Sequence, residues 1–276
     1  MMKKALLNIL LLLALLAASV AYAEEEAPSY SRIIDVPGIG PLTYYAQNDP
    51  EWARSAYEPQ NSSNFRTFQM NGCGPTAAAM AIARQVPAER LPELIDYARS
   101  PVKGFPYCPC SVNNHKCDRT HPVSYPTTAE DFYSHLPVIF GSYAAGNNRR
   151  GTLYRKEFTA TSISLFSALA NDYGLYYKAV RDWSQARQAL DAGYSVITTV
   201  TAGVFTETSH YLFLAGVDGG YLYILDPLMR EDYDALDKNH ILEVVEPGLI
   251  RASLNNLDKL RLSSFYVISD EEIILQ

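Results

Sequence analysis

The chain has 276 residues, a formal net charge of −7 at neutral pH and four cysteines. An acidic balance without a cluster of basic residues argues against nucleic acid or an anionic membrane surface as a partner. The sequence also has no glycine-rich phosphate loop and no dinucleotide-binding fingerprint, so no cofactor of that kind is expected.

Residues 1–23 have the pattern of a secretory signal peptide. A basic start precedes the apolar run of residues 5–20, and Ala21-Tyr22-Ala23 is a small-x-small cleavage site. The apolar run is short compared with the ~20 residues that span a bilayer. We therefore expect cleavage after Ala23, a secreted or periplasmic protein and no retained membrane span, with a retained anchor as the alternative.

The rest of the chain divides into a lead-in and one domain with an insertion. Residues 24–43 are acidic and then rich in proline and glycine, which is typical of an extended lead-in. Residues 44–276 are the expected domain, and they are numerous enough for one large hydrophobic core. Residues 100–126 contain many prolines, three cysteines and two histidines with little periodicity, and they predict an irregular inserted loop.

Helical patterns come first along the chain, and strand patterns follow. Helices are predicted over residues 76–85, 87–99 and 161–173, from a start at Thr128, and from Asp182 to Gly193. Strands are predicted over residues 194–201, 209–217, 221–225, 241–246 and 265–269. Asp218-Gly219-Gly220 is a tight-turn signal that makes two of these strands a hairpin. Helices followed by antiparallel strands predict an α+β fold.

The segment Asn71-Gly72-Cys73-Gly74-Pro75-Thr76 places a cysteine at the start of a helix. The flanking glycines leave the backbone around the sulfur unobstructed, and Pro75 suits the first helical position, where a missing N–H costs nothing. Unpaired N–H groups and the positive end of the helix dipole favour a thiolate there, which a nucleophilic cysteine needs. A buried cysteine that packs as a small hydrophobe is the alternative for any lone cysteine.

A histidine and an aspartate suit this cysteine as catalytic partners. His210 opens the strand over residues 209–217, and Asp226 follows the partner strand across the hairpin. Both are about equally far from the turn, so antiparallel pairing brings them near each other. A carboxylate beside an imidazole fixes its tautomer and stabilises the imidazolium. Taken singly, His210 could be a partly buried or capping residue and Asp226 an ordinary turn residue before proline.

Four blocks occur in one order along the chain: Tyr45-Ala46-Gln47-Asn48-Asp49-Pro50-Glu51-Trp52, Gly72-Cys73-Gly74-Pro75-Thr76, Ser209-His210-Tyr211-Leu212 and Asp226-Pro227. Together they resemble the peptidase C39-like family of papain-like cysteine peptidases. The resemblance implies a fold in which an N-terminal helix carrying the cysteine packs on an antiparallel sheet carrying the histidine and aspartate. It also implies Cys73 as nucleophile, His210 as general base and then acid, Asp226 as orienter, and no cofactor.

The resemblance further implies that Gln47 completes the oxyanion site. Its side-chain amide would donate to the oxyanion beside the backbone N–H of Cys73, and one such donor is typically worth ~10²–10³ in rate. Gln69 is a rival because it lies closer to Cys73 in the sequence. We prefer Gln47 because it stands in the Asp-Pro-x-Trp context.

The inserted loop carries its own cluster of cysteines. In an oxidising compartment a disulfide between Cys117 and either Cys108 or Cys110 is the expected state. Cys108, Cys110, His115 and Cys117 could instead bind zinc, although the Cys-x-Cys spacing is tighter than usual for a zinc finger. Either arrangement would be structural rather than catalytic.

These features predict a secreted or periplasmic cysteine peptidase that hydrolyses a peptide or isopeptide bond through a Cys73 acyl-enzyme. Its partner would be a peptide or protein substrate. A same-fold acyl or peptidyl transferase, in which an amine resolves the acyl-enzyme, is the closest alternative. A non-catalytic binding module of the same fold is the alternative from another class, and the intact set of four site residues argues against it.

Overall fold

The structure is a computed structural model that describes residues 29–54, 67–86, 133–144, 155–156 and 160–276. Residues 1–28, the helix expected over 87–99, the inserted loop 100–126 and the helix start at Thr128 lie outside the described residues.

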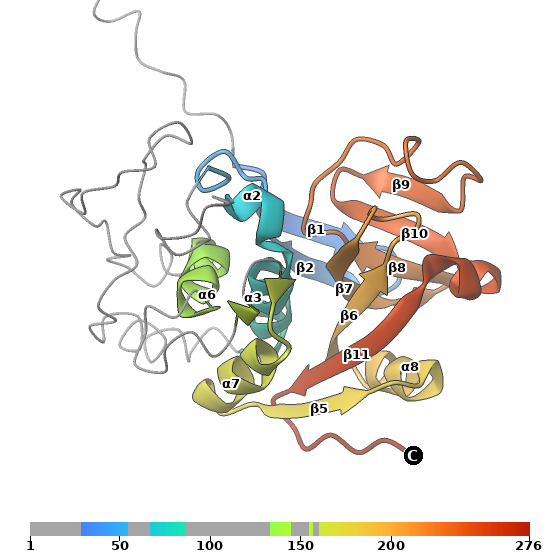
Figure 1. Cartoon of the computed structure of the whole chain (residues 1–276). Helices are drawn as coiled ribbons and strands as arrows, with labels where there is room; N and C mark the ends of the chain where they lie inside the picture. The colour runs from blue at the N-terminus through green and yellow to red at the C-terminus, as the bar shows by residue number, and fades with distance from the viewer. Residues whose placement is uncertain (1–28, 55–66, 87–132, 145–154, 157–159) are drawn as a thin grey trace, which may run out of the picture.

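A seven-stranded antiparallel sheet forms the C-terminal half of the chain (Figure 1). Its strand order is β5-β11-β6-β7-β8-β10-β9. The strands are β5 (Tyr176–Val180), β6 (Ser195–Thr201), β7 (Ser209–Asp218), β8 (Tyr221–Leu225), β9 (Leu242–Glu246), β10 (Leu249–Ser253) and β11 (Leu262–Ser269). β7 is the central strand, so residues along it have a neighbouring strand on each side, β6 and β8.

Alternate residues of β7 enter two separate hydrophobic clusters. Phe213 and Ala215 belong to a cluster that includes α3 (Cys73–Gln85), whereas Leu212 and Leu214 belong to a cluster that includes α8 (Trp183–Asp191). This alternation follows from the two-residue period of a strand. Because both faces are buried, the strand has a nearly continuous apolar sequence instead of an alternating one.

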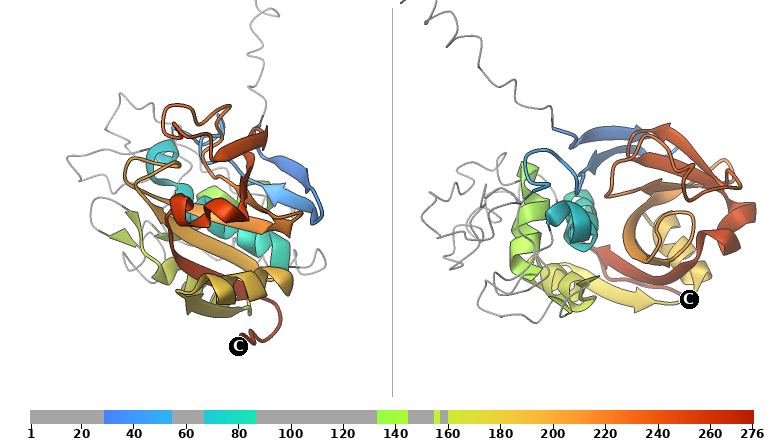
Figure 2. Two further views of the ribbon diagram at one scale, coloured as in Figure 1. Left: turned by 90° about the vertical axis from the view of Figure 1, so that its right-hand side faces the viewer. Right: turned by 45° about the horizontal axis from the view of Figure 1, so that its top comes forward.

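Helix α3 lies between the sheet and α6 (Leu136–Ala144) (Figures 1 and 2). Its buried face is built largely from alanines, whose small side chains let the backbone approach both neighbours. The Ser195 hydroxyl on β6 donates to the Ala81 carbonyl at 2.9 Å, and the Gln85 amide donates to Ser195 Oγ at 3.0 Å. These bonds fix the C-terminal half of α3 on the sheet and thereby set where its first residue lies.

Two shorter helices, two hairpins and a 3-10 helix, η3 (Leu254–Leu260), complete the described secondary structure. α2 (Phe68–Asn71) directly precedes α3, and α7 (Ser164–Asp172) precedes β5. β3 (Arg155–Lys156) pairs with β4 (Ala160–Thr161), and β1 (Arg32–Val36) pairs with β2 (Gly40–Tyr44).

The β1–β2 hairpin lies largely within the segment that we expected to be an extended lead-in. Ile34, Val36 and Tyr44 are buried in the same cluster as α3, while Ile33 is exposed on the other face. The proline and glycine residues that suggested a lead-in occupy the turn and the strand ends, and Gly38 and Gly40 both have positive φ. The described part of this segment therefore belongs to the domain core.

The predicted α+β class agrees with the mixed helix and antiparallel sheet. The five predicted strands are confirmed as β6, β7, β8, β9 and β11, and the Asp182 carboxylate caps α8 by accepting from the Ser184 N–H at 3.0 Å. The helix expected from residue 161 begins only at Ser164, because Thr161 pairs in β4. Strands β5 and β10 were not predicted, since a half-buried lysine and a half-buried arginine interrupt their apolar patterns.

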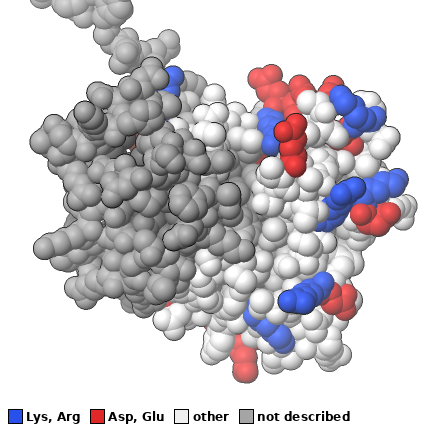
Figure 3. Space-filling model, viewed as in Figure 1, with Lys and Arg blue, Asp and Glu red and all other residues white. Residues whose placement is uncertain are grey.

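Two further features of the described residues are the character of the helices and the distribution of surface charge. Among the described helices, none has both the length and the apolar character that crossing a bilayer requires. Figure 3 shows basic and acidic side chains interspersed on the visible described face. Ion pairs among the described residues include Arg251 with Glu243 at 2.6 Å and Arg187 with Asp191 at 2.8 Å.

Candidate active site

Cys73 is the first residue of α3 and is half-buried. Its backbone N–H has no acceptor within its own helix, as for any residue at a helix start. Pro75 is the third helical residue instead of the first, but it still lies in the turn where its missing N–H costs nothing. Gly74 packs against Thr161, and a Cβ at position 74 would come within 2.5 Å of the Thr161 Cβ. Glycine therefore allows β4 to approach the start of the cysteine helix.

His210 and Asp226 come together at one end of two neighbouring strands. His210 is the second residue of β7, and Asp226 directly follows β8. His210 Nε2 lies 2.6 Å from Asp226 Oδ1, and both side chains are buried. His210 is also hydrogen bonded to Cys73, and with Nε2 occupied by the carboxylate, Nδ1 is the ring nitrogen that remains for the sulfur. The structure thus brings the three side chains together, with His210 between Cys73 and Asp226.

The charges of this group depend on one another. Burial by itself would lower the pKa of His210, but the charge and hydrogen bond of Asp226, with a further hydrogen bond to Cys73, raise it from 6.5 to about 10. Burial would likewise raise the pKa of Asp226, and the charge and hydrogen bond of His210 lower it below its usual range. At neutral pH the pair is therefore an imidazolium next to a carboxylate.

Two tyrosines that the sequence analysis did not single out hold Asp226. The Tyr233 hydroxyl donates to Asp226 Oδ2 at 2.6 Å, and the Tyr44 hydroxyl donates to the Asp226 backbone carbonyl at 2.8 Å. The Leu228 N–H donates to Oδ1 at 2.8 Å. Each oxygen of this buried carboxylate thus has a hydrogen-bond donor from the protein. Tyr233 lies only seven residues after Asp226, yet no local pattern distinguishes it among the twenty tyrosines of the chain.

Gln47 is buried and joins two parts of the site. Its backbone N–H donates to the Pro227 carbonyl at 2.7 Å, and its side-chain Nε2 donates to the Gln69 carbonyl at 2.6 Å. Gln47 Oε1 is buried without a hydrogen-bond partner in the described structure. The rival Gln69 contributes this backbone carbonyl, whereas its own side chain is exposed.

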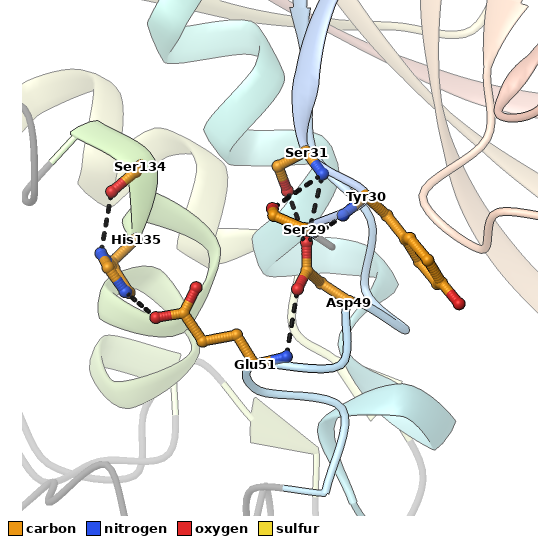
Figure 4. Close-up of polar contacts among 7 residues, drawn as sticks. All are labelled: Ser29, Tyr30, Ser31, Asp49, Glu51, Ser134 and His135. Atoms are coloured by element: carbon orange, nitrogen blue, oxygen red, sulfur yellow. Dashed lines mark hydrogen bonds and ion pairs between the residues drawn. The ribbon is translucent and has the colours of Figure 1, made fainter. Parts of the chain in front are cut away.

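The residues after Gln47 are anchored on two further sides (Figure 4). Asp49 is fully buried, and its carboxylate accepts hydrogen bonds from the Ser29 hydroxyl and the backbone N–H groups of Tyr30, Ser31 and Glu51. The Glu51 carboxylate pairs with His135 Nε2 at the start of α6. The segment that carries Gln47 is therefore tied to the N-terminal residues and to α6.

The zinc or disulfide cluster expected at Cys108, Cys110, His115 and Cys117 lies outside the described residues. Within the described ranges, no group of three or more His, Cys, Asp or Glu side chains is arranged to hold a metal ion.

Residues 42–246 match a family model with the description Peptidase_C39 like family. The match includes Gln47, Cys73, His210 and Asp226. The chain belongs to this family. Comparison with curated proteins gives no match. Membership in the Peptidase_C39 like family supports a function of the cysteine peptidase type, and the mixed helix and antiparallel sheet is consistent with a papain-like fold.

Replacing Tyr233 tests whether its hydroxyl stabilises the buried Asp226 carboxylate. Tyr233→Phe removes the donor to a buried carboxylate oxygen, and we expect the free energy of unfolding to fall by ~1–3 kcal/mol. Tyr194→Phe is the control, since its hydroxyl makes only an exposed contact with the Glu272 carbonyl at 3.4 Å. Urea unfolding at neutral pH measures both changes, and equal losses in the two variants would contradict the assignment.

Replacing Asp226 tests the charge of His210. Iodoacetate is attracted by an imidazolium beside the sulfur and neutral iodoacetamide is not, so the ratio of their alkylation rates at Cys73 reports the protonation of His210. Since the pKa of His210 is raised to about 10, the wild-type ratio should stay high through neutral pH and fall only near that value. In Asp226→Asn the main cause of the rise is gone and burial still lowers the pKa, so the fall should move to lower pH.

Glu243→Gln is the control for this pH profile. It removes an exposed carboxylate that pairs with Arg251 at 2.6 Å, so its profile should match wild type. An unchanged midpoint in Asp226→Asn would show that Asp226 does not set the charge of His210.

Proposed function

We propose that this chain is a cysteine peptidase that hydrolyses a peptide or isopeptide bond through an acyl-enzyme on Cys73. One observation carries the proposal: a buried His210 lies between the thiol of Cys73 and the carboxylate of Asp226. An imidazolium in this position provides both a counter-charge for a thiolate and a proton for a leaving amine. The family membership supports the same class of reaction.

The proposed reaction begins when the Cys73 sulfur attacks the carbonyl carbon of the scissile bond. The carbonyl π electrons move to oxygen and form a tetrahedral oxyanion. As the C–N bond breaks, His210 Nδ1–H gives its proton to the leaving amine, which leaves a thioester on Cys73 and a neutral imidazole. His210 then takes a proton from water, the hydroxide attacks the thioester, and the thiolate departs from the new carboxyl group.

Asp226 has the role of orienter. Because its Oδ1 holds Nε2, the ring cannot turn its other nitrogen away from the sulfur without breaking a buried charge-assisted bond of 2.6 Å. The carboxylate also stabilises the imidazolium that is present before acylation and that forms again when His210 takes a proton from water.

Gln47 is proposed as the side-chain donor to the oxyanion, together with the backbone N–H of Cys73. The Gln47 amide nitrogen has two hydrogens, and one is given to the Gln69 carbonyl, so one remains for the oxyanion. Burial of Gln47 supports this role, since a fixed donor in a water-excluded position stabilises developing charge best. The exposed side chain of Gln69 has no comparable support.

We further propose a papain-like arrangement of this site and export of the chain. The position of α3 against the sheet, with Cys73 at its first residue, supports the arrangement. The pattern of residues 1–23 supports export to a secreted or periplasmic location, with cleavage after Ala23.

Peptide hydrolysis is tested with a mixed-sequence peptide library in oxygen-18 water. Wild type should generate new carboxyl termini that carry the heavy oxygen, and Cys73→Ala should generate none while keeping the wild-type circular dichroism spectrum. New bonds to added amines, without heavy oxygen, would identify a transferase instead. Full turnover by Cys73→Ala would refute the nucleophile assignment.

The oxyanion assignment is tested by comparing Gln47→Ala with Gln69→Ala in two reactions of the same thiol. Acylation by 4-nitrophenyl acetate passes through an oxyanion, whereas alkylation by iodoacetamide does not. Gln47→Ala should lower the acylation rate by ~10²–10³ and leave alkylation unchanged, because only acylation uses the donor. If Gln69→Ala gives this pattern and Gln47→Ala does not, the donor is Gln69.

A further inference from the structure

The loop that carries Gln47 and the loop that carries Asp226 are joined directly. We call residues 45–49 the glutamine loop, which follows β2, and residues 226–230 the aspartate loop, which follows β8. Asn48 Nδ2 donates to the Met229 carbonyl at 3.0 Å, and the Met229 N–H donates to Asn48 Oδ1 at 3.0 Å. With the bond from the Gln47 N–H to the Pro227 carbonyl, this makes three hydrogen bonds between the two loops.

The reciprocal pair uses both halves of the Asn48 carboxamide. Its NH₂ group donates to the carbonyl of Met229 while its oxygen accepts from the N–H of the same residue. Asn48 is half-buried, so part of this pair is shielded from competing water. The pair therefore holds the backbone of the glutamine loop at a defined distance from that of the aspartate loop.

Both ends of this link lie next to groups of the proposed reaction. Asn48 follows Gln47 in the chain, and Met229 follows Leu228, whose N–H binds the Asp226 carboxylate at 2.8 Å. Asp226 is also held by the hydroxyls of Tyr233 and Tyr44. Because the aspartate has these other anchors, loss of the Asn48 pair should leave Asp226 in place. The glutamine loop keeps its bonds at Asp49 and to the Gln69 carbonyl, so we expect a local shift of this loop near Gln47.

We propose that Asn48 is a positioning residue that sets the place of the Gln47 amide relative to the His210–Asp226 pair. This inference rests on the proposed role of Gln47 as oxyanion donor. Asn48 itself touches no reacting atom; it acts through Gln47. A displacement of about 1 Å at a donor can cost ~10²-fold in rate, so a lost positioning contact is measurable even when the protein stays folded.

The test uses 4-nitrophenyl acetate and iodoacetamide on the full chain with Asn48 replaced. Asn48→Ala removes both hydrogen bonds, and Asn48→Leu removes them while filling a similar volume. Both should lower the rate of acylation by about tenfold or more, within the range that a misplaced donor costs. Both should keep the wild-type rate of alkylation, because Cys73 and His210 are not displaced.

A double-mutant cycle separates positioning from general loss of stability. In a Gln47→Ala background, Asn48→Ala should cause no further loss of acylation, because the group that it positions is already absent. Asn256→Ala is the control, since Asn256 makes only an exposed hydrogen bond with Lys259 at 2.9 Å, and it should react like wild type with both reagents.

The outcomes distinguish a failure of the role proposed for Asn48 from a failure of the role proposed for Gln47. If Gln47→Ala slows acylation but Asn48→Ala and Asn48→Leu do not, the role of Asn48 is wrong and the proposed oxyanion donor stands. If Gln47→Ala also acylates at the wild-type rate, the oxyanion role and the inference built on it both fail. Equal losses of acylation and alkylation in both Asn48 variants, or an additive loss in the double variant, would show a structural role only and overturn the inference.

Discussion

The buried pair of His210 and Asp226 is the constraint on which the rest of the site depends. A carboxylate with no exposed surface is stable only if its charge is matched and its oxygens have donors. Here the imidazolium matches the charge, and Tyr233 and the Leu228 N–H supply the donors. The same pair keeps His210 protonated at neutral pH and directs its other nitrogen to Cys73.

The topology explains how distant segments reach this pair. The central position of β7 places His210 between neighbouring strands, and the β7–β8 hairpin returns the chain to Asp226 beside it. The alanine-rich α3 lies close enough to the sheet to bring Cys73 to the same end. The β1–β2 hairpin then delivers Gln47 and the Tyr44 hydroxyl from the N-terminal side.

Features with a local pattern could be predicted from the sequence, and those that depend on distant contacts could not. The hairpin at Asp218-Gly219-Gly220 and the helix start at Cys73 follow from residues within one turn of each other. Tyr233 and Asn48 are ordinary residues locally. The role of Asn48 arises only where the two loops meet, and that of Tyr233 only where the chain after β8 folds back on Asp226. The β1–β2 hairpin was not predicted for the same reason, because its proline and glycine residues form a turn whose strands are buried by distant parts of the chain.

On this structure, His210 is an imidazolium held between Asp226 and Cys73 at a pH where a solvent-exposed histidine is neutral. Nitrogen-15 NMR of histidine-labelled protein measures this directly, with His210→Ala to assign the resonances. At about pH 8 both ring nitrogens of His210 should have the chemical shifts of a protonated imidazolium, because the pKa of His210 is raised to about 10. A neutral His210 ring at that pH would contradict the account.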